Sequence, residues 1–341
     1  MRKIGGISFG PVIGMSGVTG FFTGKEYPYH ALFRKIVPGF AWAMERMVPC
    51  AKTTTLLKRV GNMPLGWNYR PVEFLPRCII CGPRQFRYGV ALNAVSLSGP
   101  GAQALLDDGR WQDMAEPFFL SFMSVAETVE DQIEEFRLFA RMLVKEQFKA
   151  KVALQINLSC PNVGAHDQSV LVYFAGRMTE VANEESLEMP LVFKLSAAET
   201  ETFGVKQAAQ IAALDGCAGL CVSNTIPFGW NGINGDDWEK YFPGFKTGNT
   251  EMRSPLKRRG FQQEGGLSGA PLLPVTVDWI RRFRQLNSKC PIIGGGGILH
   301  PEDVDRMAEA GADKIAIGSA AFLRPWRLEG IIARAHKLLG E

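Results

Sequence analysis

A chain of 341 residues, 46% hydrophobic and 21% charged, has the composition of a folded globular protein and not of a disordered one. Its formal charge of +4 is small for this length, which argues against a concentrated basic face, so no nucleic-acid partner is expected. The length is sufficient for one large domain or two ordinary ones.

The cysteines and the first residues of the chain indicate in which cellular compartment the protein is expected. The seven cysteines are odd in number and form no compact disulfide framework. Met-Arg-Lys-Ile at the start is followed by Gly-Gly and not by a long apolar run, so no secretory signal is expected. The most apolar early segment, 31–50, is interrupted by charged residues and prolines and is not expected to span a bilayer. We therefore expect a cytoplasmic protein with no membrane partner.

Short apolar runs alternate with helical segments along most of the chain. Helical spacing of apolar residues is clear after Thr128, which is a suitable N-cap, and again over 274–286. This alternation predicts a parallel sheet, and no Gly-x-Gly-x-x-Gly follows the first strand, so we favour a (β/α)8 barrel over a doubly wound sheet. The expected strands lie within 4–15, 47–51, 89–92, 118–125, 151–156, 191–195, 220–223, 291–293 and 314–317.

We expect one domain spanning residues 1–341. Two segments rich in proline, glycine and arginine, at about 56–88 and 227–263, do not fit the strand–helix alternation. We interpret them as long loop excursions from the barrel.

Polar residues follow several of the expected strands. Lys52 and Lys194 lie at strand ends, and Cys160 lies between two asparagines in a turn. The active sites of (β/α)8 barrels are built at the carboxyl ends of the strands, so these side chains are expected to meet at one mouth. Solvated lysines at a barrel rim are the alternative. The functional hypothesis places each ammonium against a ring that gains negative charge on reduction, as a flavin does.

Three glycine-rich segments suit a phosphate. Two of them, 294–297 and 318–319, follow what we take to be the seventh and eighth strands, the usual phosphate site of such barrels. The third is 265–269. Together they predict a ligand that carries a phosphate group.

No metal site is expected. The four histidines are scattered, and Cys78 and Cys81 form a lone C-x-x-C pair, which we interpret as two core-facing thiols on a hairpin. A redox or metal role for that pair is the alternative. The basic cluster of Arg253, Lys257, Arg258 and Arg259 is interpreted as solvated surface, with contact to a phosphate or carboxylate as the alternative.

One string, Asn157-Leu158-Ser159-Cys160-Pro161-Asn162, is more specific than the rest. It occurs in order with segments 15–17, 52–56, 61–62, 93–97, 122–126, 194–195, 224–225, 265–269, 294–297 and 317–319. With these motifs the chain resembles the dihydroorotate dehydrogenase family. Members of that family are FMN-dependent (β/α)8 barrels that oxidise dihydroorotate to orotate in pyrimidine biosynthesis.

The resemblance implies roles for individual residues. Cys160 would be the base that abstracts a proton while hydride passes to FMN, and Lys52 would also belong to the catalytic site. A cysteine at position 160 resembles the soluble class, without the extra N-terminal segment of the membrane-bound class, and a homodimer is implied. FMN would be held by Ser16, Gly17, Lys52, Asn157, Lys194, Gly269, Gly296, Gly297, Gly318 and Ser319. The substrate would be held by Lys52, Asn93, Asn157, Asn162, Asn224 and Thr225.

The chain departs from the family after Asn93. The usual Met-Gly-Leu is replaced there by Val95-Ser96-Leu97-Ser98, at the rim of the substrate pocket. This leaves open another dihydropyrimidine or a cyclic imide as substrate. The electron acceptor is also open: fumarate, oxygen, or NAD through a partner iron–sulfur flavoprotein.

Three other proteins of similar fold are alternatives. The dihydropyrimidine dehydrogenase domain has histidine where Asn162 stands. A tRNA dihydrouridine synthase has a Gly-Cys-Pro string where this chain has Ser159-Cys160-Pro161, and the low net charge also argues against it. A non-catalytic flavin-binding barrel would have no reason to retain both lysines, the asparagines and the thiol.

Overall fold

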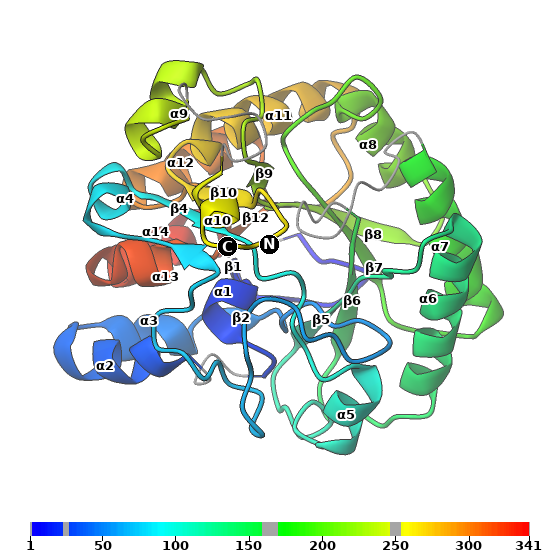
Figure 1. Cartoon of the computed structure of the whole chain (residues 1–341). Helices are drawn as coiled ribbons and strands as arrows, with labels where there is room; N and C mark the ends of the chain where they lie inside the picture. The colour runs from blue at the N-terminus through cyan, green and yellow to red at the C-terminus, as the bar shows by residue number, and fades with distance from the viewer. Residues whose placement is uncertain (1, 23–26, 159–169, 246–253, 341) are drawn as a thin grey trace.

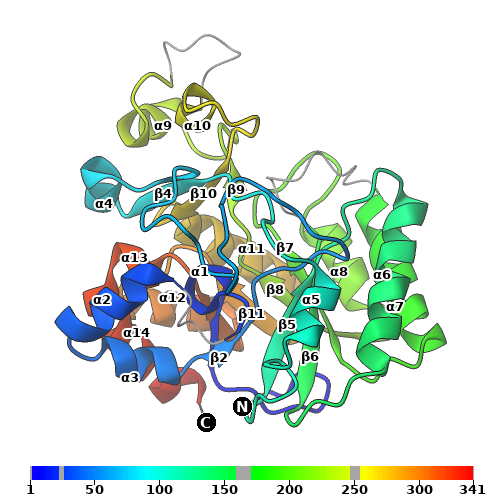
Figure 2. The same ribbon diagram turned by 60° about the horizontal axis from the view of Figure 1, so that its bottom comes forward.

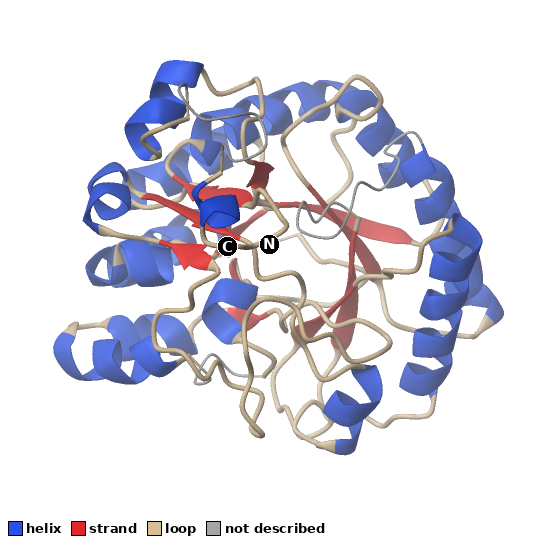
Figure 3. Cartoon of the chain, viewed as in Figure 1, coloured by secondary structure: helices blue, strands red, loops and turns tan. Residues whose placement is uncertain are grey.

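Eight parallel strands form a nearly closed barrel, as predicted, in the computed structural model of the chain (Figures 1 and 3). The structure describes residues 2–22, 27–158, 170–245 and 254–340. The strand order is β2-β1-β12-β11-β8-β7-β6-β5, and isolated parallel bridges from Cys50 to Phe119 and from Thr54 to Phe122 join its two edges. The barrel strands are β1 (Val12–Gly14), β2 (Val48–Pro49), β5 (Phe118–Phe122), β6 (Val152–Asn157), β7 (Leu191–Leu195), β8 (Cys217–Val222), β11 (Ile292–Gly295) and β12 (Lys314–Ile317).

Helices surround the barrel (Figure 3). Thr128 caps the helix that follows β5 by accepting a hydrogen bond from the Asp131 backbone N–H, as its position in the sequence predicts. Pro301 opens another helix, which ends at Gly311 in the left-handed conformation (φ 104°). The surrounding helices are α2 (Pro28–Ile36), α3 (Phe40–Glu45), α5 (Ala102–Asp107), α6 (Val129–Val144), α7 (Leu171–Glu184), α8 (Val205–Ala212), α11 (Leu272–Leu286), α12 (Pro301–Ala310) and α14 (Leu328–Leu339). Short helical turns are α1 (Ser16–Thr19), α13 (Ala320–Leu323) and η2 (Pro325–Arg327).

A second, antiparallel sheet covers the carboxyl ends of the barrel strands (Figure 2). Its order is β3-β4-β10-β9, and two excursions from the barrel build it. Its strands are β3 (Ile79–Ile80), β4 (Val90–Asn93), β9 (Ile226–Pro227) and β10 (Gly266–Gly269), and the helices beside it are α4 (Pro83–Tyr88), α9 (Gly235–Tyr241) and α10 (Pro255–Arg258).

This small sheet corrects two predictions. The run 89–92 was expected to be a barrel strand, but β4 pairs with β3 and β10 instead. The glycine-rich segment 265–269 was expected to be a phosphate loop, but it is largely strand β10. A short apolar run indicates that a segment is buried, but it does not indicate whether the segment pairs with a parallel or an antiparallel strand. The strand that pairs with β4 here, β10, is itself rich in glycine and therefore resembles a loop in the sequence.

Two apolar layers hold the barrel together. Inside it, Phe9 stacks on Phe119 with ring centroids 4.3 Å apart, near the amino ends of the strands. Outside it, the helices pack on outward-facing residues such as Phe122, whose ring stacks on Phe139 of α6 at 4.3 Å. Within the described ranges, no helix has both the length and the apolar character needed to cross a bilayer.

The Phe122–Phe139 stack gives a test of the fold. Both rings are fully buried, so Phe139→Ala leaves a cavity against β5 and is expected to lower the free energy of unfolding by about 3–5 kcal/mol. Leu138→Ala is the control, because this neighbour on α6 is 41% exposed and its truncation is expected to change stability by only about 0.5 kcal/mol. Urea unfolding measures both values, and equal losses for the two variants would contradict the packing described.

Candidate active site

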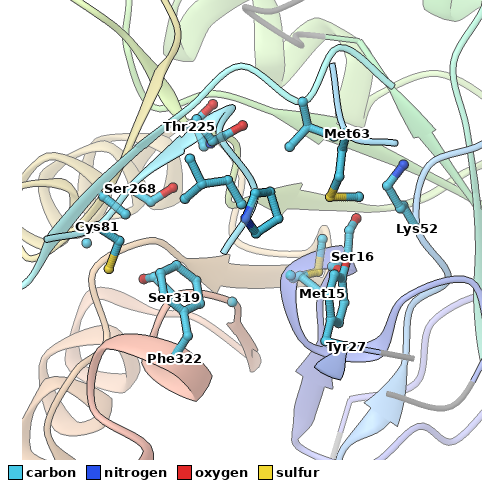
Figure 4. Close-up of a pocket in the computed structure, with 18 of the residues that line it drawn as sticks. Met15, Ser16, Tyr27, Lys52, Met63, Cys81, Thr225, Ser268, Ser319 and Phe322 are labelled. Carbon is cyan, nitrogen blue, oxygen red and sulfur yellow. The ribbon is translucent and has the colours of Figure 1, made fainter. Parts of the chain in front are cut away.

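A cavity of about 810 Å³ lies at the carboxyl ends of the barrel strands, under the small sheet (Figure 4). Every predicted ligand-binding residue that the structure describes lines it. Cys160 and Asn162 lie outside the described residues. The predicted residues in the lining are Ser16, Gly17, Lys52, Asn93, Asn157, Lys194, Asn224, Thr225, Gly269, Gly296, Gly297, Gly318 and Ser319.

The two predicted lysines differ in how they are held. Lys52 is 6% exposed, donates a hydrogen bond to the Ser98 carbonyl oxygen, and lies 4.9 Å from the centroid of the Phe21 ring. Lys194, at the end of β7, is 8% exposed, and its ammonium forms no hydrogen bond or ion pair with the described residues. Burying an ammonium without a partner is costly, so Lys194 is suited to meet a negative or electron-rich group in the cavity.

Two asparagines are oriented by each other. Asn157 ends β6 and stands in register with Lys194 of β7. Its side-chain oxygen accepts a 2.8 Å hydrogen bond from the Asn224 amide nitrogen. The Asn157 amide nitrogen therefore remains as a donor beside the Lys194 ammonium. Both groups can stabilise negative charge at one edge of a ligand.

Asn93 reaches the cavity from above. It belongs to β4 of the small sheet, not to a barrel strand, and its amide nitrogen donates a 3.2 Å hydrogen bond to the Gly266 carbonyl oxygen. The cavity is thus enclosed between amides from the barrel below and an amide from the small sheet above.

The glycines of the cavity fall into two groups. Gly296 and Gly297 have φ values of 97° and 81°, and a Cβ at Gly297 would lie 2.5 Å from the Leu273 backbone nitrogen, so the fold itself requires glycine there. Gly17 and Gly318 do not have a left-handed φ, and no atom of the described residues would lie within 4 Å of a Cβ added at either position. Their missing side chains leave space open at the cavity wall, as a bound ligand would require.

The backbone conformation of the loop after Asn93 was not predicted from the sequence. Ser96 and Leu97 both have left-handed backbones, with φ of 56° and 57°, which is uncommon for two successive residues other than glycine. Ser98 holds the loop, because its hydroxyl accepts a 2.9 Å hydrogen bond from the Met63 N–H and donates to the Val95 carbonyl oxygen. This left-handed segment therefore forms one wall of the cavity.

Apolar residues form the outer part of the cavity, which was not predicted. Figure 4 shows Tyr27, Met63 and Phe322 among the side chains around it. Tyr27 donates a 2.6 Å hydrogen bond to the Ser16 carbonyl oxygen, which fixes the turn after β1. The apolar spacing of helices cannot separate such residues from ordinary core, so this lining left no distinct signal in the sequence.

The C-x-x-C pair is divided between core and cavity. Cys78 is fully buried, as expected, whereas Cys81 lines the cavity wall. Burial raises the pKa of Cys78 to about 11 and of Cys81 to about 12, so both are neutral thiols. Among the described residues, no group of histidine, cysteine and carboxylate side chains is arranged to hold a metal ion.

Comparisons with known proteins agree with this geometry. The family model "Dihydroorotate dehydrogenase" matches residues 241–339. The catalytic subunit of dihydroorotate dehydrogenase B (NAD(+)) from Geobacillus sp. (strain WCH70) is 31% identical over 257 residues, covering 74% of this chain and 72% of that relative. The chain belongs to the dihydroorotate dehydrogenase family.

Other relatives extend the match over most of the chain. The corresponding Bacillus pumilus subunit is 28% identical over 334 residues, covering 96% of this chain and 87% of that dihydroorotate dehydrogenase. Among solved structures, ligand-free DHODH from Eimeria tenella has a TM-score of 0.60 at 18% identity, covering 97% of this chain and 84% of its own. The complex of that enzyme with ferulenol has a TM-score of 0.61 at 19% identity, covering 99% and 84%. These structures support the shared dihydroorotate dehydrogenase barrel fold.

The contrast between the two lysines leads to a prediction. Lys194→Met removes a buried charge that has no hydrogen-bond or ion-pair partner among the described residues, so the ligand-free protein is expected to become more stable by about 1–2 kcal/mol. Lys52→Met removes the donor to the Ser98 carbonyl and is expected to lower stability by about 1 kcal/mol. Both variants carry the same Lys→Met substitution at different positions. Urea unfolding measures whether each one raises or lowers the free energy of unfolding. A loss of stability in Lys194→Met would show that its ammonium already has a partner.

Proposed function

We propose that this protein is an oxidoreductase that converts dihydroorotate to orotate with FMN, as a step of pyrimidine biosynthesis. The observation that carries the proposal is the Lys194 ammonium, buried at the cavity floor beside the Asn157 amide with no described partner. The names of the sequence relatives, dihydroorotate dehydrogenases at about 30% identity, support the same reaction.

The cavity fits FMN in three respects. Its volume of about 810 Å³ is within the range of cofactor and ligand pockets. The open space at Gly17 and Gly318 admits a ligand against the backbone, and Ser319 provides a hydroxyl next to the second of these glycines. FMN bound there would supply an acceptor for hydride. We propose that Ser16, Gly17, Lys52, Asn157, Lys194, Gly269, Gly296, Gly297, Gly318 and Ser319 hold it.

The protein's own residues have separate tasks in the proposed reaction. Lys194 and the Asn157 amide stabilise negative charge at the cavity floor. The carbonyl and N–H groups of the pyrimidine are bound by six side chains: Lys52, Asn93, Asn157, Asn162, Asn224 and Thr225. Cys160, which follows β6 in the sequence, abstracts the C–H proton as base. The small sheet excludes water from the site.

A related cyclic substrate is the second candidate. The left-handed Ser96–Leu97 segment replaces the usual family sequence at the cavity wall, and Ser96 itself lines the cavity. A changed wall shape favours a dihydropyrimidine or cyclic imide other than dihydroorotate. The chemistry at Lys194 and Cys160 would be the same for either substrate.

The organisation of the protein in the cell is part of the proposal. We infer one domain over residues 1–341, a homodimer, and a cytoplasmic location. The relatives are named as catalytic subunits of an NAD(+)-linked enzyme, which supports a second subunit as the route for electrons out of the site. Fumarate and oxygen are the alternative acceptors.

The proposal predicts a flavin that dihydroorotate can reduce. The purified protein is expected to show a flavin absorption spectrum, which bleaches when dihydroorotate is added without oxygen. A protein that contains FMN but does not bleach would rule out dihydroorotate and favour the second candidate. Dihydrouracil and a cyclic imide, added in parallel, identify the alternative substrate.

The base is tested separately. Cys160→Ala removes the proton acceptor, so flavin reduction by dihydroorotate is expected to slow by roughly 10²–10⁴-fold at neutral pH while orotate still binds. Stopped-flow absorbance measures the rate, and the orotate-induced change of the flavin spectrum measures binding. Cys81→Ala is the control, since this neutral thiol lines the same cavity. Reduction of the Cys160→Ala protein at the wild-type rate would reject the base assignment.

A further inference from the structure

Two cysteines lie on neighbouring strands at the end of the barrel opposite the cavity. Cys217 begins β8, and Cys290 lies two residues before β11. These strands are paired, with Leu220 aligned to Ile292, and the Leu220 N–H donates a 2.9 Å hydrogen bond to the carbonyl oxygen of Pro291, next to Cys290. Neighbouring strands lie about 4.8 Å apart, within the Cα separation of roughly 4.4–6.8 Å that a disulfide spans.

An extra residue in β8 places both thiols on the same face of the sheet. Leu191 of β7 aligns with Cys217, but the next residue, Val192, aligns with Gly219, so Ala218 is an insertion in β8. Cys217 therefore points outward with Leu220, into the apolar layer between the barrel and its helices, where Cys290 also lies. Without the insertion, the alternation of side chains would turn Cys217 to the other face.

The two sulfur atoms already interact. The Cys217 sulfur lies 3.7 Å from the Gly219 carbonyl oxygen, and the Cys290 sulfur lies 3.6 Å from the Pro291 carbonyl oxygen on the adjacent chain segment. The proximity of the Cys217 thiol, with the nearby Arg284 charge, lowers the pKa of Cys290 against the opposing effect of burial. Arg284 is fixed in place, since it donates to the Cys290 carbonyl oxygen at 2.7 Å and to the Asp313 carboxylate at 2.6 Å. Cys290 is thus the more acidic thiol and Cys217 its proton-bearing partner.

The pair can be reached from solvent. Cys217 is only partly buried and lines a second cavity of about 340 Å³, bounded by α7 and the segment before β7. A small oxidant that enters this cavity meets the Cys217 sulfur and, through it, Cys290. Among the described residues, the thiols nearest the active-site cavity belong to other positions, so this pair is separate from the proposed catalytic site.

We propose that Cys217 and Cys290 form a reversible dithiol–disulfide site oxidised by hydroperoxides. The Cys217 sulfur, which lines the second cavity, attacks a peroxide oxygen, the O–O bond breaks, and Cys217 becomes a sulfenic acid while its proton passes to the oxygen that leaves as water or an alcohol. The Cys290 sulfur then attacks that sulfenic acid, an S–S bond forms, and water leaves. Two thiols are oxidised by two electrons in total, and one hydroperoxide is reduced. The site does not depend on the proposed dihydroorotate chemistry.

The bond would tie the amino ends of β8 and β11 together. The closed loop, 217–290, contains the β9, α9, α10 and β10 part of the cavity cover as well as α11. A crosslink of this length restricts the unfolded chain, so the oxidised protein resists unfolding better than the reduced one.

Peptide mapping of the full-length protein tests the site. After treatment with stoichiometric hydrogen peroxide, alkylation and trypsin digestion without reduction, a crosslink is expected between peptides 207–240 and 290–306. The melting temperature is expected to rise by several degrees, and dithiothreitol should reverse both changes.

Peptide 207–240 also contains Cys221, which provides a matched control. Cys221 faces the barrel interior, with its sulfur 3.2 Å from the Ser223 hydroxyl, so Cys221→Ser should keep the crosslink whereas Cys217→Ser should lose it. A crosslink that survives Cys217→Ser, or Cys290 oxidised to a sulfinic acid with Cys217 left free to alkylate, would overturn the proposal. Mapping of the wild-type protein decides the question even if a variant does not fold.

Discussion

The alignment of β6 with β7 is the constraint on which the cavity depends. It sets Asn157 opposite Lys194, and the bond from Asn224 of the next barrel connection then fixes the Asn157 amide. A slip of one residue in either strand would turn one of these side chains out of the barrel. The apolar neighbours of these residues along the strands, such as Ile156 and Leu195, face the helices. They hold this register, because a shift by one residue would place polar side chains in the apolar layer.

The cavity combines two surfaces of different origin. The barrel contributes its charged and amide groups from strand ends, where backbone positions are rigid. The small sheet contributes Asn93 and the strained Ser96–Leu97 loop. Groups on the barrel strands and groups on the cover can thus change independently of each other.

Much of this arrangement could be predicted from the sequence, for a physical reason. Parallel strands with crossover helices all end on one edge of the sheet, so Lys52, Lys194 and Asn224 could be placed at one mouth without knowing any distance. The small sheet could not be predicted in the same way. Its β4 looks like any buried strand, and its partner β10 makes up most of the apparent glycine loop 265–269, whose conformation depends on pairing. The left-handed Ser96 and Leu97 were also out of reach, because neither residue type favours that conformation. Cys160 and Asn162, central to the sequence argument, lie outside the described residues, so their roles stay predictions.

The pairing of β4 with β10 has a consequence for the order in which the molecule can assemble. Asn93 and Gly266, joined across this pair, are 173 residues apart in the chain. Closing so long a loop is entropically unfavourable early in folding, whereas the neighbouring strands β5, β6, β7 and β8 are each separated by one helix only. We therefore expect the β5–β8 part of the barrel to form first and the cover to dock later, so that the protein acquires a closed cavity only at a late stage of folding.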